Sequence, residues 1–143
     1  NTASALIALD SSRKPVYEEN LDQFLADIEA LDNYIDNLFK GIKKRQFLTF
    51  HPAWGYFADD YDLEMISIEV GGQEPSAELL AEIIRLVDTY EIEAIFLQRE
   101  FSSNSVQALI EETGVEMIVL DPLAEDWLAN MKIMADAFAE ALQ

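Results

Sequence analysis

Beyond residue 45, short apolar runs alternate with amphipathic stretches, and this alternation constrains the fold more than any other feature. Apolar runs of strand length occupy 46–50, 65–70, 94–97 and 116–120. Helix-length segments with an apolar side occupy 53–61, 76–90, 103–112 and 124–142. Strands buried on both faces are continuously apolar, and strands that alternate with helices form parallel sheets. We therefore predict an α/β fold with a four-stranded parallel sheet and helices on both faces.

A long helix is predicted ahead of the sheet, from about Arg13 to Lys44. Its apolar residues recur in steps of four and three, the spacing of a helical stripe: Tyr17, Leu21, Phe24, Ile28, Leu31, Ile35 and Leu38. In the final helix, the inward side is predicted to contain Trp127, Leu128, Met131, Met134, Ala135 and Phe138. We divide the chain into the end of a preceding helix (1–12), a long linker helix (13–45) and an α/β lobe (46–143).

Composition excludes several classes of function. The chain has 143 residues, a formal net charge of −19 and only nine Lys and Arg, too few clustered cations for nucleic acid or an anionic membrane surface. Cysteine is absent, which excludes disulfides and thiolate metal sites within these residues. The first residues, 1–6, lack the basic segment and long apolar core of a signal peptide.

Three polar residues stand at the ends of predicted strands: His51, Gln98 and Asp121. Right-handed crossovers bring the carboxyl ends of parallel strands to one edge of the sheet, where ligands bind in such folds. Imidazole and carboxylate together begin a Zn²⁺ or Mn²⁺ site, although zinc sites use three or four protein ligands. Structural alternatives stay open: His51 as a hydrogen-bonded strand-end residue, and Asp121-Pro122 as a turn into the last helix.

Five segments, in order, resemble the metal-binding solute-binding proteins of ABC importers, a family that carries zinc or manganese and includes adhesion-type lipoproteins. The resemblance covers nearly the whole chain, and each segment is individually modest. The segments are 17–21 (YEENL), 51–57 (HPAWGYF), 69–76 (EVGGQEPS), 95–98 (IFLQ) followed by Phe101-Ser102, and 120–123 (LDPL).

The resemblance implies two α/β lobes joined by a rigid helix, with the metal held between them. Two ligands would come from the N-terminal lobe; His51 matches the third ligand position and Asp121 the fourth. This chain has no second histidine and no histidine-rich loop. It therefore resembles a truncated C-terminal half with its linker helix, in which metal binding is expected to be weak or absent.

The resemblance thus implies extracytoplasmic capture of a divalent metal for an ABC permease, without enzymatic activity. Zinc is favoured over manganese, because manganese prefers harder oxygen ligands than histidine. Expected partners are the permease and the missing N-terminal lobe, and a homodimer is expected at high concentration through the uncovered apolar surface. Two alternatives are a flavodoxin-like enzyme domain that uses His51 and Asp121, and an interaction module that pairs through the long helix.

Overall fold

The computed structural model describes residues 1–98 and 103–143, and its centre is a parallel sheet. Four strands lie in the order β2-β1-β3-β4, so the chain starts inside the sheet and adds one strand on one side and two on the other. The predicted α/β class and parallel sheet are confirmed. The strands are β1 (Gln46–Thr49), β2 (Glu64–Ser67), β3 (Ala94–Gln98) and β4 (Glu116–Leu120).

Strand register brings the carboxyl ends of the strands to one edge of the sheet. Thr49 at the end of β1 is opposite Ser67 of β2 and Phe96 of β3. On the far side of β3, Gln98 is opposite Leu120, the last residue of β4. This edge is where the loops to the helices begin, as a right-handed parallel fold requires.

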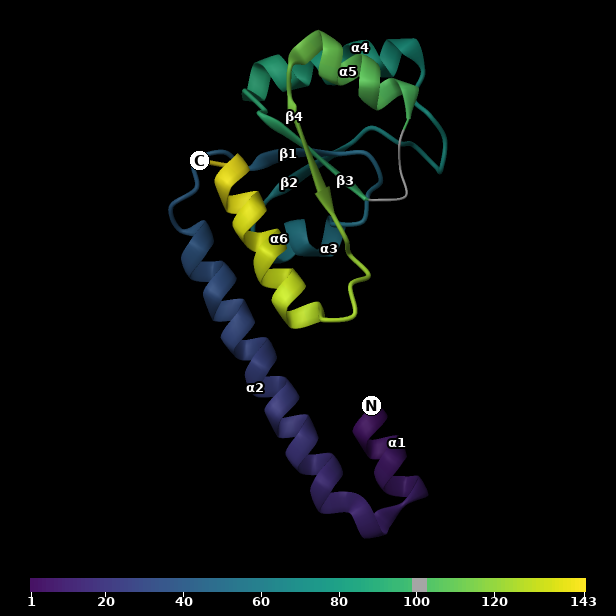
Figure 1. Ribbon diagram of the computed structural model, residues 1–143, viewed down its shortest axis with the longest axis vertical. Coiled ribbons are helices and arrows are strands. Elements are labelled where there is room, and N and C mark those ends of the chain that lie inside the picture. The colour runs from purple at the N-terminus through teal and green to yellow at the C-terminus, as the bar shows by residue number, and fades with distance from the viewer. Residues whose placement is uncertain (99–102) are drawn as a thin grey trace.

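Helices cover both faces of the sheet (Figure 1). Helices α4 and α5 lie on one face, and α3 and α6 lie on the other, with α2 alongside α6. A single 3₁₀ turn at Ser11–Arg13 separates α1 from α2. The helices are α1 (Thr2–Leu9), α2 (Lys14–Phe39), α3 (Gly55–Asp60), α4 (Ala77–Tyr90), α5 (Asn104–Thr113) and α6 (Trp127–Ala141).

Helix ends follow local sequence signals. The side chains of Ser76, Ser103 and Asp126 each accept a hydrogen bond from the backbone N–H three residues on, at the starts of α4, α5 and α6. Such caps satisfy N–H groups that the helix itself leaves without partners. Helix α5 ends at Gly114, whose φ of 75° is left-handed, a conformation that glycine adopts without steric cost.

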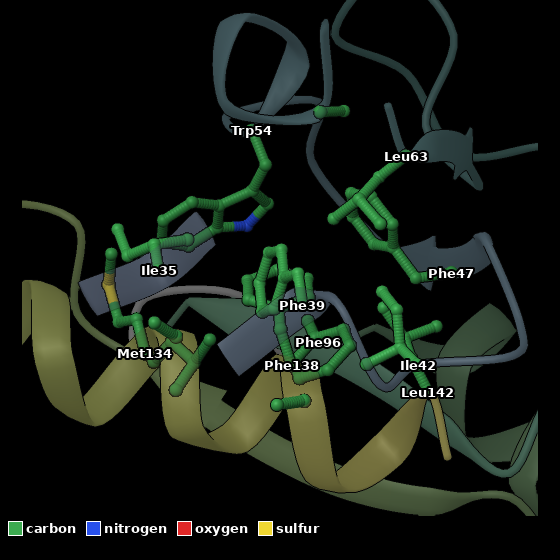
Figure 2. Packing of buried hydrophobic residues seen from close by; sticks show 14 of the residues in the cluster. Ile35, Phe39, Ile42, Phe47, Trp54, Leu63, Phe96, Met134, Phe138 and Leu142 are labelled. Atoms are coloured by element: carbon green, nitrogen blue, oxygen red, sulfur yellow. The ribbon is translucent and has the colours of Figure 1, made fainter. Parts of the chain in front are cut away.

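Alternating side chains of the central strands fill two cores. Leu48 and Ile95 face α4 and α5, while Phe47 and Phe96 face α3 and α6. The second core is rich in aromatic rings, and Figure 2 shows Phe138 of α6 among them. All five side chains are essentially inaccessible to solvent. Burial on both faces explains why successive residues in the middle of these strands are apolar.

Helix α2 has two halves with different surroundings. Its second half packs on α6 and buries Leu31 and Ile35. The Tyr34 hydroxyl donates to Asp136 of α6 at 2.5 Å, which ties the helices together. Its first half projects from the lobe with α1 folded back beside it (Figure 1).

The structure corrects details of the sequence interpretation. The long helix, predicted within residues 13–44 with its end near Gly41, ends at Phe39; beyond it, the backbone N–H groups of Lys43 and Lys44 donate to the carbonyl of Leu142. Trp127 is 37% exposed rather than inward, because it begins α6 and meets Phe24 of α2 at a ring distance of 5.5 Å.

The predicted apolar stripe of α2 is buried only in its second half. Phe24 and Ile28 are 46% and 39% exposed, and Phe24 is covered in part by Trp127 of α6. Of the predicted segments, Phe101 and Ser102 lie outside the described residues. No helix in the described part of the chain is long and apolar enough to cross a membrane.

Candidate functional site

His51 stands two residues beyond β1, on a backbone fixed by hydrogen bonds. The Thr49 hydroxyl, itself buried, lies 3.0 Å from the His51 carbonyl and 3.1 Å from the Phe96 carbonyl of β3. The backbone N–H of Ala53 also donates to the His51 carbonyl, at 2.8 Å. These contacts place the histidine at the carboxyl edge of the sheet.

The His51 ring meets a buried carboxylate. Its Nδ1 lies 3.0 Å from Oε2 of Glu69, and the Glu69 side chain is 8% exposed against 40% for His51. An ionised carboxylate only accepts hydrogen bonds, so a hydrogen bond between His51 Nδ1 and ionised Glu69 requires the ring proton on Nδ1. In the neutral ring, the lone pair then belongs to Nε2, the other nitrogen that can bind a metal.

Glu69 reaches His51 because β2 lies directly beside β1. The Glu69 backbone N–H donates to the Phe50 carbonyl at 3.0 Å. The Ser67 hydroxyl lies 3.1 Å from the Phe50 carbonyl and 3.0 Å from the Glu69 carbonyl. The exits of the two strands are therefore held together, and the carboxylate comes to lie against the imidazole.

Glu69 is the residue that reasoning from the sequence missed at this site, although it begins the 69–76 segment. Its signal is an acidic residue at the end of an apolar run, Met65–Val70, that was predicted to be a buried strand. Carboxylates are rarely buried unless they are paired, so such a residue indicates a specific partner.

Asp121 follows β4 directly and shapes a turn. Its Oδ1 accepts from the backbone N–H of Leu123 at 2.9 Å, which is the turn that the sequence left open as an alternative. Its backbone carbonyl accepts from Asn130 Nδ2 of α6 at 2.7 Å. One oxygen of the carboxylate is thus engaged in the turn.

Parallel topology places the predicted site residues at the same edge of the sheet. Gln98 ends β3, which lies between the strands that precede His51 and Asp121. Two steps across the sheet separate these strands by about 10 Å. In residues 1–98 and 103–143, no three His, Cys, Asp or Glu side chains form a group that could hold a metal ion. The metal-binding role of His51 and Asp121 therefore stays a prediction.

Trp54 marks the transition from the site to the core. Its ring is only 5% exposed, and its centroid lies 5.9 Å from that of the Phe138 ring. Its Nε1 has no hydrogen-bond partner among the described residues. The loop after His51 is thereby anchored in the aromatic core (Figure 2).

The described residues thus form a parallel α/β lobe with polar residues at its strand ends, preceded by a projecting helix. The chain belongs to the family described as ZnuA, zinc-uptake complex component A periplasmic, whose family model matches residues 1–141. This confirms the family that the five segments of the sequence indicated.

Similar proteins carry zinc in their names. The chain is 30% identical over 125 residues to the high-affinity zinc uptake system protein ZnuA of Bacillus subtilis (strain 168), covering 86% of this chain and 39% of that protein. It is 32% identical over 124 residues to the zinc-binding protein AdcA of Streptococcus pyogenes serotype M3, covering 85% of this chain and 24% of that protein.

Solved structures match almost the whole chain. A crystal structure of ZnuA superposes with a TM-score of 0.95 at 39% identity, covering 99% of this chain and 54% of that one. A zinc-bound deletion mutant of ZnuA superposes with a TM-score of 0.92 at 39% identity, covering 99% and 55%. The chain thus spans about half the length of these structures, and less of the two relatives above.

Proposed function

We propose that the chain is the C-terminal half of an extracytoplasmic protein that captures zinc and passes it to an ABC permease. The family, the zinc-named relatives and the zinc-bound neighbour support this proposal. In it, zinc is the cargo, and the protein acts by binding rather than by catalysis. Zinc remains favoured over manganese because an imidazole nitrogen suits zinc better.

The observation that carries the proposal is the common edge of His51 and Asp121. The chain has a single histidine, and the fold holds it at the sheet edge where Asp121 also lies. A nitrogen and an oxygen ligand make up half of a tetrahedral zinc site. The remaining ligands would come from the preceding lobe in the whole protein and from water in this chain.

The domain division becomes part of the same proposal. Residues 46–143 would form the C-terminal lobe, 13–45 the linker helix, and 1–12 the end of a helix from the preceding lobe. The projecting first half of α2, with α1 folded back on it, supports this division (Figure 1). The preceding lobe would cover exposed apolar side chains there, such as Phe24 and Leu25.

Titration calorimetry with Zn²⁺ tests the metal site. We expect weak binding of one ion per chain, weakened at least tenfold by His51→Ala or Asp121→Ala. Asp88→Ala is the matched control, because Asp88 is an exposed carboxylate on α4, away from the strand ends. Measurement at about 0.15 M salt screens diffuse attraction to the acidic surface.

Two outcomes would contradict the proposal. Tight one-to-one binding that survives His51→Ala would place the metal elsewhere. Equal losses in Asp121→Ala and Asp88→Ala would mean that general acidity, not the strand-end site, attracts the ion. Mn²⁺ titrated in the same way should bind more weakly than Zn²⁺.

The second candidate is an interaction module that pairs through the long helix. Exposed Phe24, Leu25 and Ile28, on the projecting half of α2, favour it. Apolar side chains gathered on an exposed surface commonly mark an interface. The enzyme alternative receives no such support, because the carboxylate that meets His51 is Glu69 rather than Asp121.

A further inference from the structure

Glu69 is a buried carboxylate with a single specific contact. Its side chain is 8% exposed, and among the described residues its carboxylate has one hydrogen-bond partner, Nδ1 of His51. A carboxylate taken out of water is costly unless a partner compensates it. The contact between Glu69 and His51 therefore compensates the burial of the carboxylate, whereas an exposed ion pair contributes little to stability.

Backbone structure around Glu69 presents the carboxylate to the ring. The Ser67 hydroxyl and the Glu69 backbone N–H both donate to the Phe50 carbonyl, just beyond β1. After Glu69 the chain turns tightly, with Val70 and Gln73 paired in an antiparallel bridge and both glycines between them at positive φ. A Cβ built on Gly72 would lie 3.8 Å from Glu69 Oε1, so the turn folds back against the carboxylate.

We propose that Glu69 is a positioning residue for His51. By accepting from Nδ1–H it holds the ring in one orientation and in one tautomer, which leaves the lone pair on Nε2 as the metal-binding electron pair. Histidines that bind metals generally give their other N–H to such an acceptor, which also raises ligand basicity. The metal-binding part of this inference rests on the proposed function; the tautomer does not.

Nitrogen NMR of the metal-free chain tests the tautomer directly. Since the sequence contains one histidine, ¹⁵N-histidine labelling gives one imidazole spin system. The spectrum is recorded at a pH above which the ring signals no longer change. We expect a pyrrole-type shift for Nδ1 and a pyridine-type shift for Nε2. The opposite pattern in the unsubstituted chain would overturn the proposal.

Three variants separate positioning from general stability. Glu69→Leu removes the acceptor, and we expect the proton to move to Nε2. Glu69→Gln keeps an amide oxygen that can accept from Nδ1–H, and we expect the original tautomer to return. Ser67→Ala loosens the same strand exit without touching the ring. Ser67→Ala should lower thermal stability and leave the His51 tautomer unchanged. A tautomer change in Ser67→Ala would mean that the strand exit, rather than the Glu69 carboxylate, sets the tautomer.

Zinc titration of the same samples completes the test. We expect Glu69→Leu to weaken Zn²⁺ binding by about 10- to 100-fold, the usual loss for such a partner, and Glu69→Gln to retain most of the affinity. If zinc left the His51 nitrogen signals unchanged, the proposed function would fail, while the tautomer result would still decide the role of Glu69. Unchanged affinity in Glu69→Leu, with zinc bound at Nε2, would overturn the positioning role.

Discussion

Truncation of Phe138 should remove the centre of the aromatic core beneath the site. Phe138 is fully buried and has ring contacts with four aromatic side chains; Figure 2 shows it among the core side chains. The centroid distances are 4.1 Å to Phe96, 4.8 Å to Phe47, 5.3 Å to Phe57 and 5.9 Å to Trp54. The ring thus joins α6 to both central strands, to α3 and to the loop after His51.

The expected cost of Phe138→Ala lies at the upper end of the usual range. Replacing a buried phenylalanine by alanine costs about 3 to 5 kcal/mol, and each aromatic pair adds about 0.5 to 1.5 kcal/mol beyond the area it buries. We expect a loss of about 4 to 5 kcal/mol. With an unfolding entropy of about 2.1 cal/mol/K per residue, 143 residues give about 0.3 kcal/mol/K. The melting temperature should therefore fall by about 13 to 17 °C.

Urea unfolding followed by tryptophan fluorescence measures this loss, since Trp54 lies in the affected cluster. Phe138→Leu should cost less than Phe138→Ala, because it leaves a smaller cavity while still losing the ring pairs. Leu123→Ala is the control, because Leu123 is 87% exposed and should change stability by less than about 0.5 kcal/mol. A Phe138→Ala loss below about 2 kcal/mol with an unchanged denaturant slope would refute this account of the core.

Three further outcomes are expected. Burial and a hydrogen bond to an α2 carboxylate raise the pKa of Tyr61. The folded state therefore gains stability from the neutral hydroxyl, in full below about pH 10 and progressively less above it. Tyr61→Phe should remove this dependence and flatten the fall of the unfolding free energy at alkaline pH. Gly114→Ala should cost about 1 to 2 kcal/mol, because its φ of 75° is left-handed. Gly41→Ala should cost less, because Gly41 has no left-handed φ and a Cβ there would meet open space. Equal losses in thermal unfolding would contradict this. Light scattering should show mass rising with concentration, less so after Phe24→Ser and Ile28→Ser; a monomer at millimolar concentration would exclude self-association.

The sheet and its functional edge could be predicted because both follow from local patterns. The middles of the central strands, residues 47–48 and 94–97, are continuously apolar, and parallel connections leave only one edge for the loops that follow. His51 and Asp121 could therefore be placed at a common edge without knowledge of the strand order. The helix caps at Ser76 and Ser103 are equally local, since each depends on one side chain and the N–H three residues on.

Features that depend on distant contacts could not be predicted in the same way. The helix end near Gly41 could be predicted, but the hydrogen bonds from Lys43 and Lys44 to the Leu142 carbonyl at the end of α6 could not. Trp127 fits a helical stripe, but the stripe does not show that α6 begins at that residue and faces α2. Glu69 acquires its partner only from the neighbouring positions of β2 and β1, an order that no local pattern contains.

Under the proposed function, the arrangement of the site explains how a lobe can bind an ion and still release it. Glu69 orients the His51 ring through its contact with Nδ1, and Asp121 is held by its turn and by Asn130 of α6. Both residues are thus fixed before a metal arrives, which reduces the ordering that binding requires. Two ligands alone leave a zinc site half complete. Tight capture would then depend on ligands outside this lobe, and moving those ligands away would lower the affinity without disturbing the buried core of the lobe.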